Sequence, residues 1–435
     1  MLQSINQKLQ NLPSDKKQFF SLGAATAIVK ALAAFFAFLL TLVVSRYSNT
    51  TTSGQFFYLF NLVSLVAIIA QLGFNISLVK FNAIAFKNQN RHEQSNNYRI
   101  ALARSLLFCV AVCSLLYLAF TTFPEQLNTT QASNFSLALA IIAIPLLVIG
   151  QTNSRVLQAS RKVITSLIAL QLGVSFLMVA LIIFAKDVYP ISTDVLMVLF
   201  LVATTVVAIH STLKWLRSGE YQHGSTKHNQ ELTYSANQVW VGSIFTNLVQ
   251  WGSLVIAGFF ISTSDLGLLA AAQRTSLLIG FVLVTINFVV APMFASLYKE
   301  GKMDRLRNLS RLACRANIGV AILPVIICVL FPEFIMQLFG KEFIAAAPLL
   351  LALSLGQLIN VATGSVGFLL LMSGHEKTMK YITIVSGVIS IALLILLSNG
   401  YGVLGAAWAM AIGLAIQNLA ALYFVKRHLG FFPVG

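Results

Sequence analysis

The chain has 435 residues, of which 57% are hydrophobic and only 10% are charged, and its formal net charge is +16. Soluble domains carry about 25% charged residues, so this composition excludes a water-soluble globular protein. It indicates a protein whose surface lies largely in a lipid bilayer.

Long apolar blocks follow one another along the whole chain. A helix that crosses the hydrocarbon needs about 20 apolar residues, and the blocks of this length predict twelve transmembrane helices. The predicted spans are 20–45, 54–79, 101–122, 134–155, 163–185, 192–213, 235–261, 268–297, 312–331, 343–372, 379–397 and 402–425. The first block follows a polar leader without a small-residue cleavage site, so we expect a retained helix.

Lys and Arg are distributed unevenly between the connections. They gather in the leader, in the connections after every second span and in the C-terminal tail, whereas the other connections hold only Arg46, Lys186 and Lys341. Short cation-rich loops stay in the cytoplasm. The pattern therefore predicts a bacterial inner-membrane protein with both termini in the cytoplasm. It also explains the positive charge without nucleic acid as a partner.

The longest connection, 214–234, predicts a cytoplasmic linker between two six-helix bundles, 1–213 and 235–435. The two bundles share sparse sequence similarity at offsets of 213 and 214 positions. The matching pairs are Gly54 with Gly267, Gly150 with Gly364, Leu157 with Leu371, and Gly173-Val174 with Gly387-Val388. An offset of six helices predicts parallel repeats related by a pseudo-two-fold axis along the membrane normal. The expected fold is thus an all-α membrane protein of two such bundles.

Two cations fall deep within predicted spans. Lys30 lies in the first span and Arg274 in the eighth, and no span carries Asp or Glu in its middle third. Charges at this depth are costly, so we predict a cationic lumen in which an anionic, phosphate-bearing substrate binds these side chains. Snorkelling to the headgroups is the alternative, and it is favoured for Arg104 and Arg155.

Neutral polar side chains within the spans are candidates to line the same lumen. They are Gln71, Asn75, Asn247, Gln250, Trp251, Asn287, Gln357 and Asn360. Hydrogen bonding between helices is the alternative role. His210 and Asp265 are candidates for proton or ion coupling, with a packed interfacial histidine as the alternative for His210. No spacing indicates a metal or cofactor site, and no cluster indicates a catalytic one.

Several segments together resemble a known family. They are SGQFFYLFNLVSLVAIIAQLGFN (53–75), DLGLLAAAQR (265–274), INFVVAPMFASLYKEGK (286–302), LFGKEFIAAAPLL (338–350), LLLMSGHEKTMKYITIVSGV (369–388) and YGVLGAAWAMAIG (401–413). In order and spacing they are similar to the polysaccharide transporters of the multidrug, oligosaccharidyl-lipid and polysaccharide exporter superfamily, which include O-antigen and capsule repeat-unit flippases.

The resemblance implies a flippase rather than an enzyme. Its substrate would be an undecaprenyl-pyrophosphate-linked oligosaccharide, moved from the cytoplasmic to the periplasmic leaflet during lipopolysaccharide or capsule synthesis, with other polysaccharide assembly proteins as partners. The family's basic lumen residues fall on Arg274 and, in related flippases, on Lys30. Many members carry an acid after the Trp of the seventh helix, where this chain has Gly252 and Ser253, so coupling through that acid is not expected.

Two other functions remain open at this stage. A multidrug or cation exporter of the same superfamily would need intramembrane carboxylates, which the spans lack. A membrane-bound polysaccharide polymerase or ligase would need a large periplasmic loop, and every predicted periplasmic loop is short.

Overall fold

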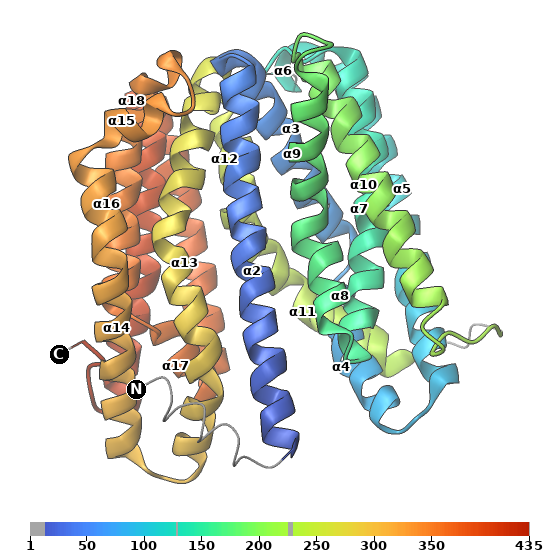
Figure 1. Cartoon of the computed structure of the whole chain (residues 1–435), viewed down its shortest axis with the longest axis vertical. Helices are drawn as coiled ribbons and strands as arrows, with labels where there is room; N and C mark the ends of the chain where they lie inside the picture. The colour runs from blue at the N-terminus through green and yellow to red at the C-terminus, as the bar shows by residue number, and fades with distance from the viewer. Residues whose placement is uncertain (1–13, 128, 225–228, 435) are drawn as a thin grey trace.

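The computed structural model describes residues 14–127, 129–224 and 229–434, and every regular element in them is helical. Ten helices within these residues are long and apolar enough to cross a bilayer. Most elements from the first half of the chain lie on one side of the bundle and most from the second half on the other, with α2 between them, while residues 230–247 of the second half reach across to the first half (Figure 1). The prediction of an all-α membrane protein is confirmed.

The first half of the chain forms nine α-helices, some long and some short, and one π-helical segment in the described residues. They are α2 (Ser14–Tyr47), α3 (Thr50–Ala70), α4 (Phe74–Lys87), α5 (Arg91–Thr122), α6 (Pro124–Leu127), α7 (Asn134–Ala159), α8 (Val163–Leu167), the π-helix η1 (Ile168–Leu172), α9 (Gly173–Ala185) and α10 (Thr193–Leu216).

The second half is built in the same manner from long helices with local interruptions. It contains α11 (Gln230–Asn247), the π-helix η2 (Leu248–Gly252), α12 (Ser253–Ala257), α13 (Thr263–Lys299), α14 (Met303–Leu330), α15 (Pro332–Gln337), the 3₁₀-helix η3 (Lys341–Ala346), α16 (Ala347–Thr363), α17 (Val366–Met372) and α18 (Glu376–Leu429).

The second predicted span, 54–79, is wrong as a continuous helix. The chain leaves the helix at Leu72 (φ 52°) and Gly73 (φ 78°), so α3 ends and α4 begins anew. A Cβ at position 73 would lie 2.2 Å from the carbonyl oxygen of Ala236 in α11. Glycine is therefore required twice, for its left-handed backbone and for this close approach. Since the helix breaks here, Gln71 and Asn75 do not share one helical face.

Glycines also divide the C-terminal spans. At Gly364 (φ 72°) the predicted span 343–372 separates into α16 and α17, so it is not one helix. At Gly402 (φ 59°, ψ −142°) α18 consists of two helical segments, where the break between 397 and 402 was expected. Gly150, paired with Gly364 by the sequence offset, lies inside α7. That pair therefore occupies different local structures.

The two halves approach most closely where α3 crosses α13. A Cβ on Gly54 would lie 1.9 Å from the Thr263 carbonyl oxygen, and one on Gly267 would lie 2.2 Å from the Thr50 carbonyl oxygen. The Ser264 hydroxyl donates to Oγ1 of Thr50 over 2.7 Å. The contact is reciprocal, since each glycine meets the residue four positions before the other. A continuous apolar core surrounds the crossing and includes residues of both halves.

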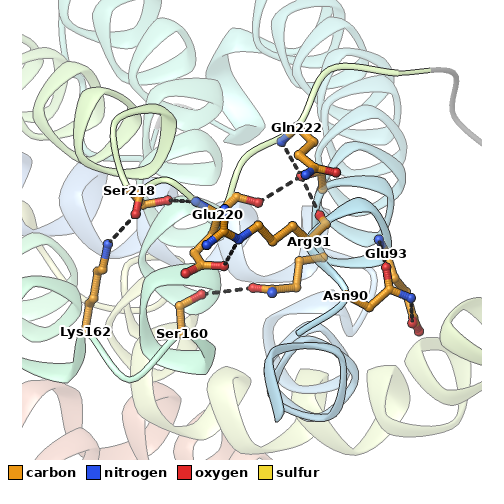
Figure 2. A network of polar contacts seen from close by, with 10 residues as sticks. Asn90, Arg91, Glu93, Ser160, Lys162, Ser218, Glu220 and Gln222 are labelled. Carbon is orange, nitrogen blue, oxygen red and sulfur yellow. Dashed lines mark hydrogen bonds and ion pairs between the residues drawn. The ribbon is translucent and has the colours of Figure 1, made fainter. Parts of the chain in front are cut away.

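The segment after α10 is bound to the first half of the chain (Figure 2). The buried Ser95 hydroxyl accepts the Gln222 N–H over 2.7 Å and lies 3.3 Å from the Glu220 carbonyl oxygen. The Glu220 carboxylate pairs with Arg91 at 3.5 Å, and Lys162 donates to the Ser218 carbonyl over 3.0 Å. Residues 218–222 of the predicted linker are thus held by α5 and by the connection between α7 and α8.

Replacing Gly54 by Ala should destabilise this arrangement of the halves. The added Cβ would meet a backbone oxygen, which has no rotamer to adopt, so α3 and α13 must separate. Overpacking of this kind costs about 1–3 kcal/mol, and thermal unfolding of the purified protein should begin several degrees lower. Gly319→Ala is the matched control, because nothing lies within 4 Å of a Cβ there. Equal melting temperatures for the two variants would contradict the close crossing.

Ser95→Ala should release the segment 218–222 from α5. The substitution leaves the Gln222 N–H without its buried acceptor, at a cost of about 1–3 kcal/mol. Limited proteolysis should then cleave this segment several-fold faster. Ser166→Ala serves as the control, since the buried Ser166 hydroxyl has no partner among the described residues. If cleavage rates in both variants equal that of the unmodified protein, the segment is not held by Ser95.

Candidate functional site

Arg274 lies in the first third of α13, about 16 Å along the axis from the start of the helix. Its guanidinium lies over two adjacent aromatic rings. The guanidinium carbon lies 5.5 Å from the centroid of Phe60 on α3 and 5.6 Å from that of Trp251 on η2. The two rings are themselves 6.2 Å apart. Elements from both halves therefore contact the cation through aromatic rings.

Further aromatic rings fix the position of Phe60. Its centroid lies 5.3 Å from that of Phe200 on α10 and 5.9 Å from that of Phe56, one turn earlier on α3. Phe56 and Phe200 are fully buried. Because these rings cannot move without opening the core, Phe60 presents a rigid face to Arg274.

No protein carboxylate neutralises Arg274 in the described part of the chain, where the ion pairs found are Arg91–Glu220, Lys186–Asp187 and Lys302–Glu300. Nor does any described group accept a hydrogen bond from its guanidinium. An arginine at the centre of a membrane helix costs about 2.5–3.5 kcal/mol on insertion scales. A desolvated cation–π contact stabilises by about 2 kcal/mol. The rings therefore offset much of the cost and leave the N–H donors for an anion.

Lys30 lies on α2, which packs against α13. Its side chain is half-buried, and its position is about 25 Å from the end of α2 at Tyr47. Lys30 therefore lies deeper than Arg274, closer to the opposite end of the bundle. Joint binding of one anion by the two cations stays a prediction.

The polar candidates of the first half are engaged in packing. Gln71 is buried, and its amide nitrogen donates to the Ala67 carbonyl over 3.2 Å and to the side chain of Gln151 on α7. Asn75 is half-buried, and its Oδ1 lacks a hydrogen-bond partner. Gln71 thus links two helices of the same half. A lumen-facing role for either residue stays a prediction.

The π-helix η2 sets the directions of the candidates around position 250. Asn247, the last residue of α11, donates to the Ser243 carbonyl over 2.8 Å. Gln250 and Trp251 follow within the wider π turn, which shifts them relative to an α-helix. Trp251 consequently covers Arg274, whereas Gln250 lines a cavity inside the second half. Asn247 and Trp251 are four positions apart and would share one face of a continuous α-helix. The π-helix η2 interrupts this spacing, so the two side chains do not lie on one face.

Of the remaining amides, Gln357 also lines this cavity. Its Oε1 accepts a hydrogen bond from Asn360 over 3.0 Å, and Gly280 on α13 allows it to approach, since a Cβ there would lie 2.7 Å from that oxygen. Asn287 is buried with its Oδ1 unpartnered. The structure therefore brings Gln250 and Gln357 to one cavity, and the lumen-lining role of Asn287 and Asn360 stays a prediction.

The two candidates for ion coupling lie apart from Arg274 along their helices. His210 is exposed near the end of α10. Asp265 is in the first turn of α13, where its carboxylate accepts a hydrogen bond from the N-cap Ser262 over 2.8 Å. This capping interaction gives Asp265 a structural role. Coupling through either residue stays a prediction. Among the described residues, no three His, Cys, Asp or Glu side chains are grouped for a metal ion.

The sequence argument named Trp251 but missed Phe60, Phe200 and two further glutamines. Phe60 and Phe200 were hidden among many apolar residues, and only the fold places Phe60 at the cation with Phe200 behind it. Gln273 and Gln417 also line the cavity. Gln273 directly precedes Arg274 in the sequence, and this adjacency to the candidate cation could have identified it as a candidate.

Residues 17–298 match the model of a family described as "Polysaccharide biosynthesis protein". The uncharacterized membrane protein EpsK of Bacillus subtilis (strain 168) is 26% identical over 182 residues, which cover 41% of this chain and 36% of EpsK. The match therefore spans about a third of that relative.

Solved structures share the fold over nearly the whole chain. A lipid II flippase, MurJ, in its inward closed conformation matches with a TM-score of 0.75 at 15% identity, covering 92% of this chain and 87% of that one. An inward-facing multidrug resistance MATE family transporter of the MOP superfamily matches with 0.71 at 15% identity, covering 93% and 98%. Since the family model covers more than half of the sequence, the chain belongs to the polysaccharide biosynthesis protein family, as its resemblance predicted, and it has the fold of the MOP superfamily transporters.

Proposed function

We propose that this protein is a flippase for undecaprenyl-pyrophosphate-linked oligosaccharides, the repeat units of O-antigen or a similar surface polysaccharide. The observation that carries the proposal is the Arg274 guanidinium, which lies over the rings of Phe60 and Trp251 and has no carboxylate partner among the described residues. A pyrophosphate supplies the missing negative charge and accepts several charge-assisted hydrogen bonds. The membership of the polysaccharide biosynthesis family supports a glycan on that phosphate.

The architecture that we propose is twelve transmembrane helices in two halves. Including α13 and treating the two segments of α18 separately raises the ten candidate spans to twelve. The halves are 1–213 and 235–435, joined by 214–234. The reciprocal contact of Gly54 and Gly267 supports a pseudo-two-fold axis along the membrane normal, because such an axis exchanges the two glycines.

Charge distribution supports the orientation in the bacterial inner membrane. The cation-rich connections between α4 and α5 and between α13 and α14 lie at one end of the bundle, and α6 and α15 lie at the other (Figure 1). The positive-inside rule assigns the first end to the cytoplasm. Both termini then lie on the cytoplasmic side.

The halves are closed at the proposed periplasmic end. Besides the glycine crossing, the Glu342 carboxylate of η3 accepts the Thr50 N–H over 3.3 Å, and Phe38 of α2 packs on Phe339 at 5.8 Å. A lipid-linked substrate would therefore reach Arg274 from the cytoplasmic side. Rocking of the halves about these contacts would expose it to the outer leaflet, by alternating access.

The positions of the acids disfavour a drug or cation exporter. All thirteen Asp and Glu residues lie in the first turns of helices, in short helices or in connections. A cationic substrate would find no carboxylate at the depth of Arg274. The similarity to multidrug transporters is one of fold, and the short connections likewise disfavour a polymerase or ligase.

Arg274→Ala should abolish or strongly reduce export. Losing charge-assisted hydrogen bonds to phosphate removes about 1.5–3 kcal/mol, which corresponds to roughly a tenfold to hundredfold loss of affinity. Lipid-linked oligosaccharide should accumulate in a deletion strain that carries the variant. Arg274→Lys should rescue partly, because it keeps the charge but not the planar stacking. Arg305→Ala, at an exposed position in the first turn of α14, is the control. Normal export by Arg274→Ala would refute the proposal.

Lys30→Ala should reduce export less than Arg274→Ala does, and Lys30→Arg should preserve it. Lys30 lies closer to the cytoplasmic end, where we expect it to attract the pyrophosphate on entry. The loss should therefore shrink as the salt concentration rises in a reconstituted assay, because salt screens the attraction that Lys30 supplies in the unmodified protein. Equal export by Lys30→Ala and the unmodified protein at all salt concentrations would remove Lys30 from the pathway.

A further inference from the structure

A cavity of about 340 Å³ lies within the second half of the chain. Elements α11, η2, α13, α16 and α18 surround it. Its polar lining comes mainly from side-chain amides and hydroxyls, namely Thr246, Gln250, Gln273, Gln357, Thr383 and Gln417, and none of the residues that line it is ionisable. The cavity is therefore uncharged, and its largely apolar wall carries amide and hydroxyl groups at a few places, as small-molecule sites do.

Three of its glutamines have side-chain amides without a hydrogen-bond partner in the described part of the protein. Gln357 is paired with Asn360. By contrast, the amides of Gln250, Gln273 and Gln417 form no side-chain hydrogen bond within the described residues. Each of them offers two N–H donors and a carbonyl acceptor. Such groups, fixed on three different elements and facing one space, suit a ligand rich in neutral hydroxyl groups.

Two pairs of consecutive residues place this cavity beside the cation. Gln273 lines the cavity and Arg274, the next residue, contacts the rings of Phe60 and Trp251. Gln250 lines the cavity and Trp251, again the next residue, covers Arg274. Consecutive Cα atoms are about 3.8 Å apart. A ligand in which a phosphate is bonded directly to a neutral polyol can therefore engage both places together.

We propose that this cavity is a subsite for the first sugar of the lipid-linked oligosaccharide, the one bonded to the pyrophosphate, and that this sugar is uncharged. The inference rests on the proposed function, because it takes the phosphate at Arg274 as given. A volume of about 340 Å³ is at the lower end of the roughly 300–1,000 Å³ typical of small-molecule sites. It therefore suits a sugar unit close to the phosphate, and the rest of the glycan lies outside.

The test compares two synthetic lipids on the full-length protein in nanodiscs. One is undecaprenyl pyrophosphate, and the other is the same lipid carrying a single N-acetylhexosamine. The unmodified protein should bind the glycosylated lipid about tenfold more tightly, since two or three neutral hydrogen bonds distinguish the lipids. The Gln273→Met/Gln417→Met double variant, which keeps side-chain length without the amides, should reduce this ratio of affinities to about one.

Controls separate this inference from the proposed function. Gln337→Met, at an exposed position of α15, should keep the tenfold ratio. Should the double variant fail to fold, Gln250→Met at an exposed position should lower the ratio about threefold. A ratio unchanged in these cavity variants overturns the sugar subsite and leaves the flippase intact. Binding of both lipids that is unaffected by Arg274→Ala overturns the phosphate site, and with it the function on which the subsite rests.

Discussion

The Arg274 guanidinium lies about 16 Å from the start of α13, and the cost of a charge at that depth constrains its surroundings. Two solutions are available to a membrane protein: an acidic partner or a polarisable environment. This chain has the second, because Phe60 and Trp251 contact the guanidinium and no described carboxylate does. The rings lower the cost without neutralising the charge. Arg274 therefore stays an attractive site for an anion.

The position of the rings depends on how α3 and α13 cross. Gly54 and Gly267 allow the two backbones to touch. Phe60 follows Gly54, and Arg274 follows Gly267, by about two turns of helix, so both lie about 10 Å below the crossing. Because both residues follow the crossing by about the same distance along their helices, their side chains lie at the same depth. The contact that closes the outer end thus also aligns the site.

The long helices were predictable because the bilayer demands uninterrupted apolar length. The break after α3 was not, since Leu72 has an uncommon positive φ, whereas the break at Gly402 falls at the boundary between two predicted spans. Arg274 stood out as an isolated charge. The roles of the amides could not be predicted, because the sequence does not distinguish a transmembrane glutamine that bonds to a neighbouring helix from one that faces a cavity. Gln71 does the former and Gln250 the latter, and the π turn at η2 decides the direction of Gln250.

The positions of the acids agree with the proposal that the substrate carries the negative charge. Several lie in the first turns of long helices, where they stabilise the helix dipole by about 0.3–1 kcal/mol each; these are Glu93, Asp194, Glu231, Asp265, Asp304 and Glu376. Because these acids lie at helix ends, none of them is at the depth of Arg274. A carboxylate moved there would satisfy the guanidinium internally and compete with phosphate. Keeping acids at the ends therefore preserves both the helices and the anion site.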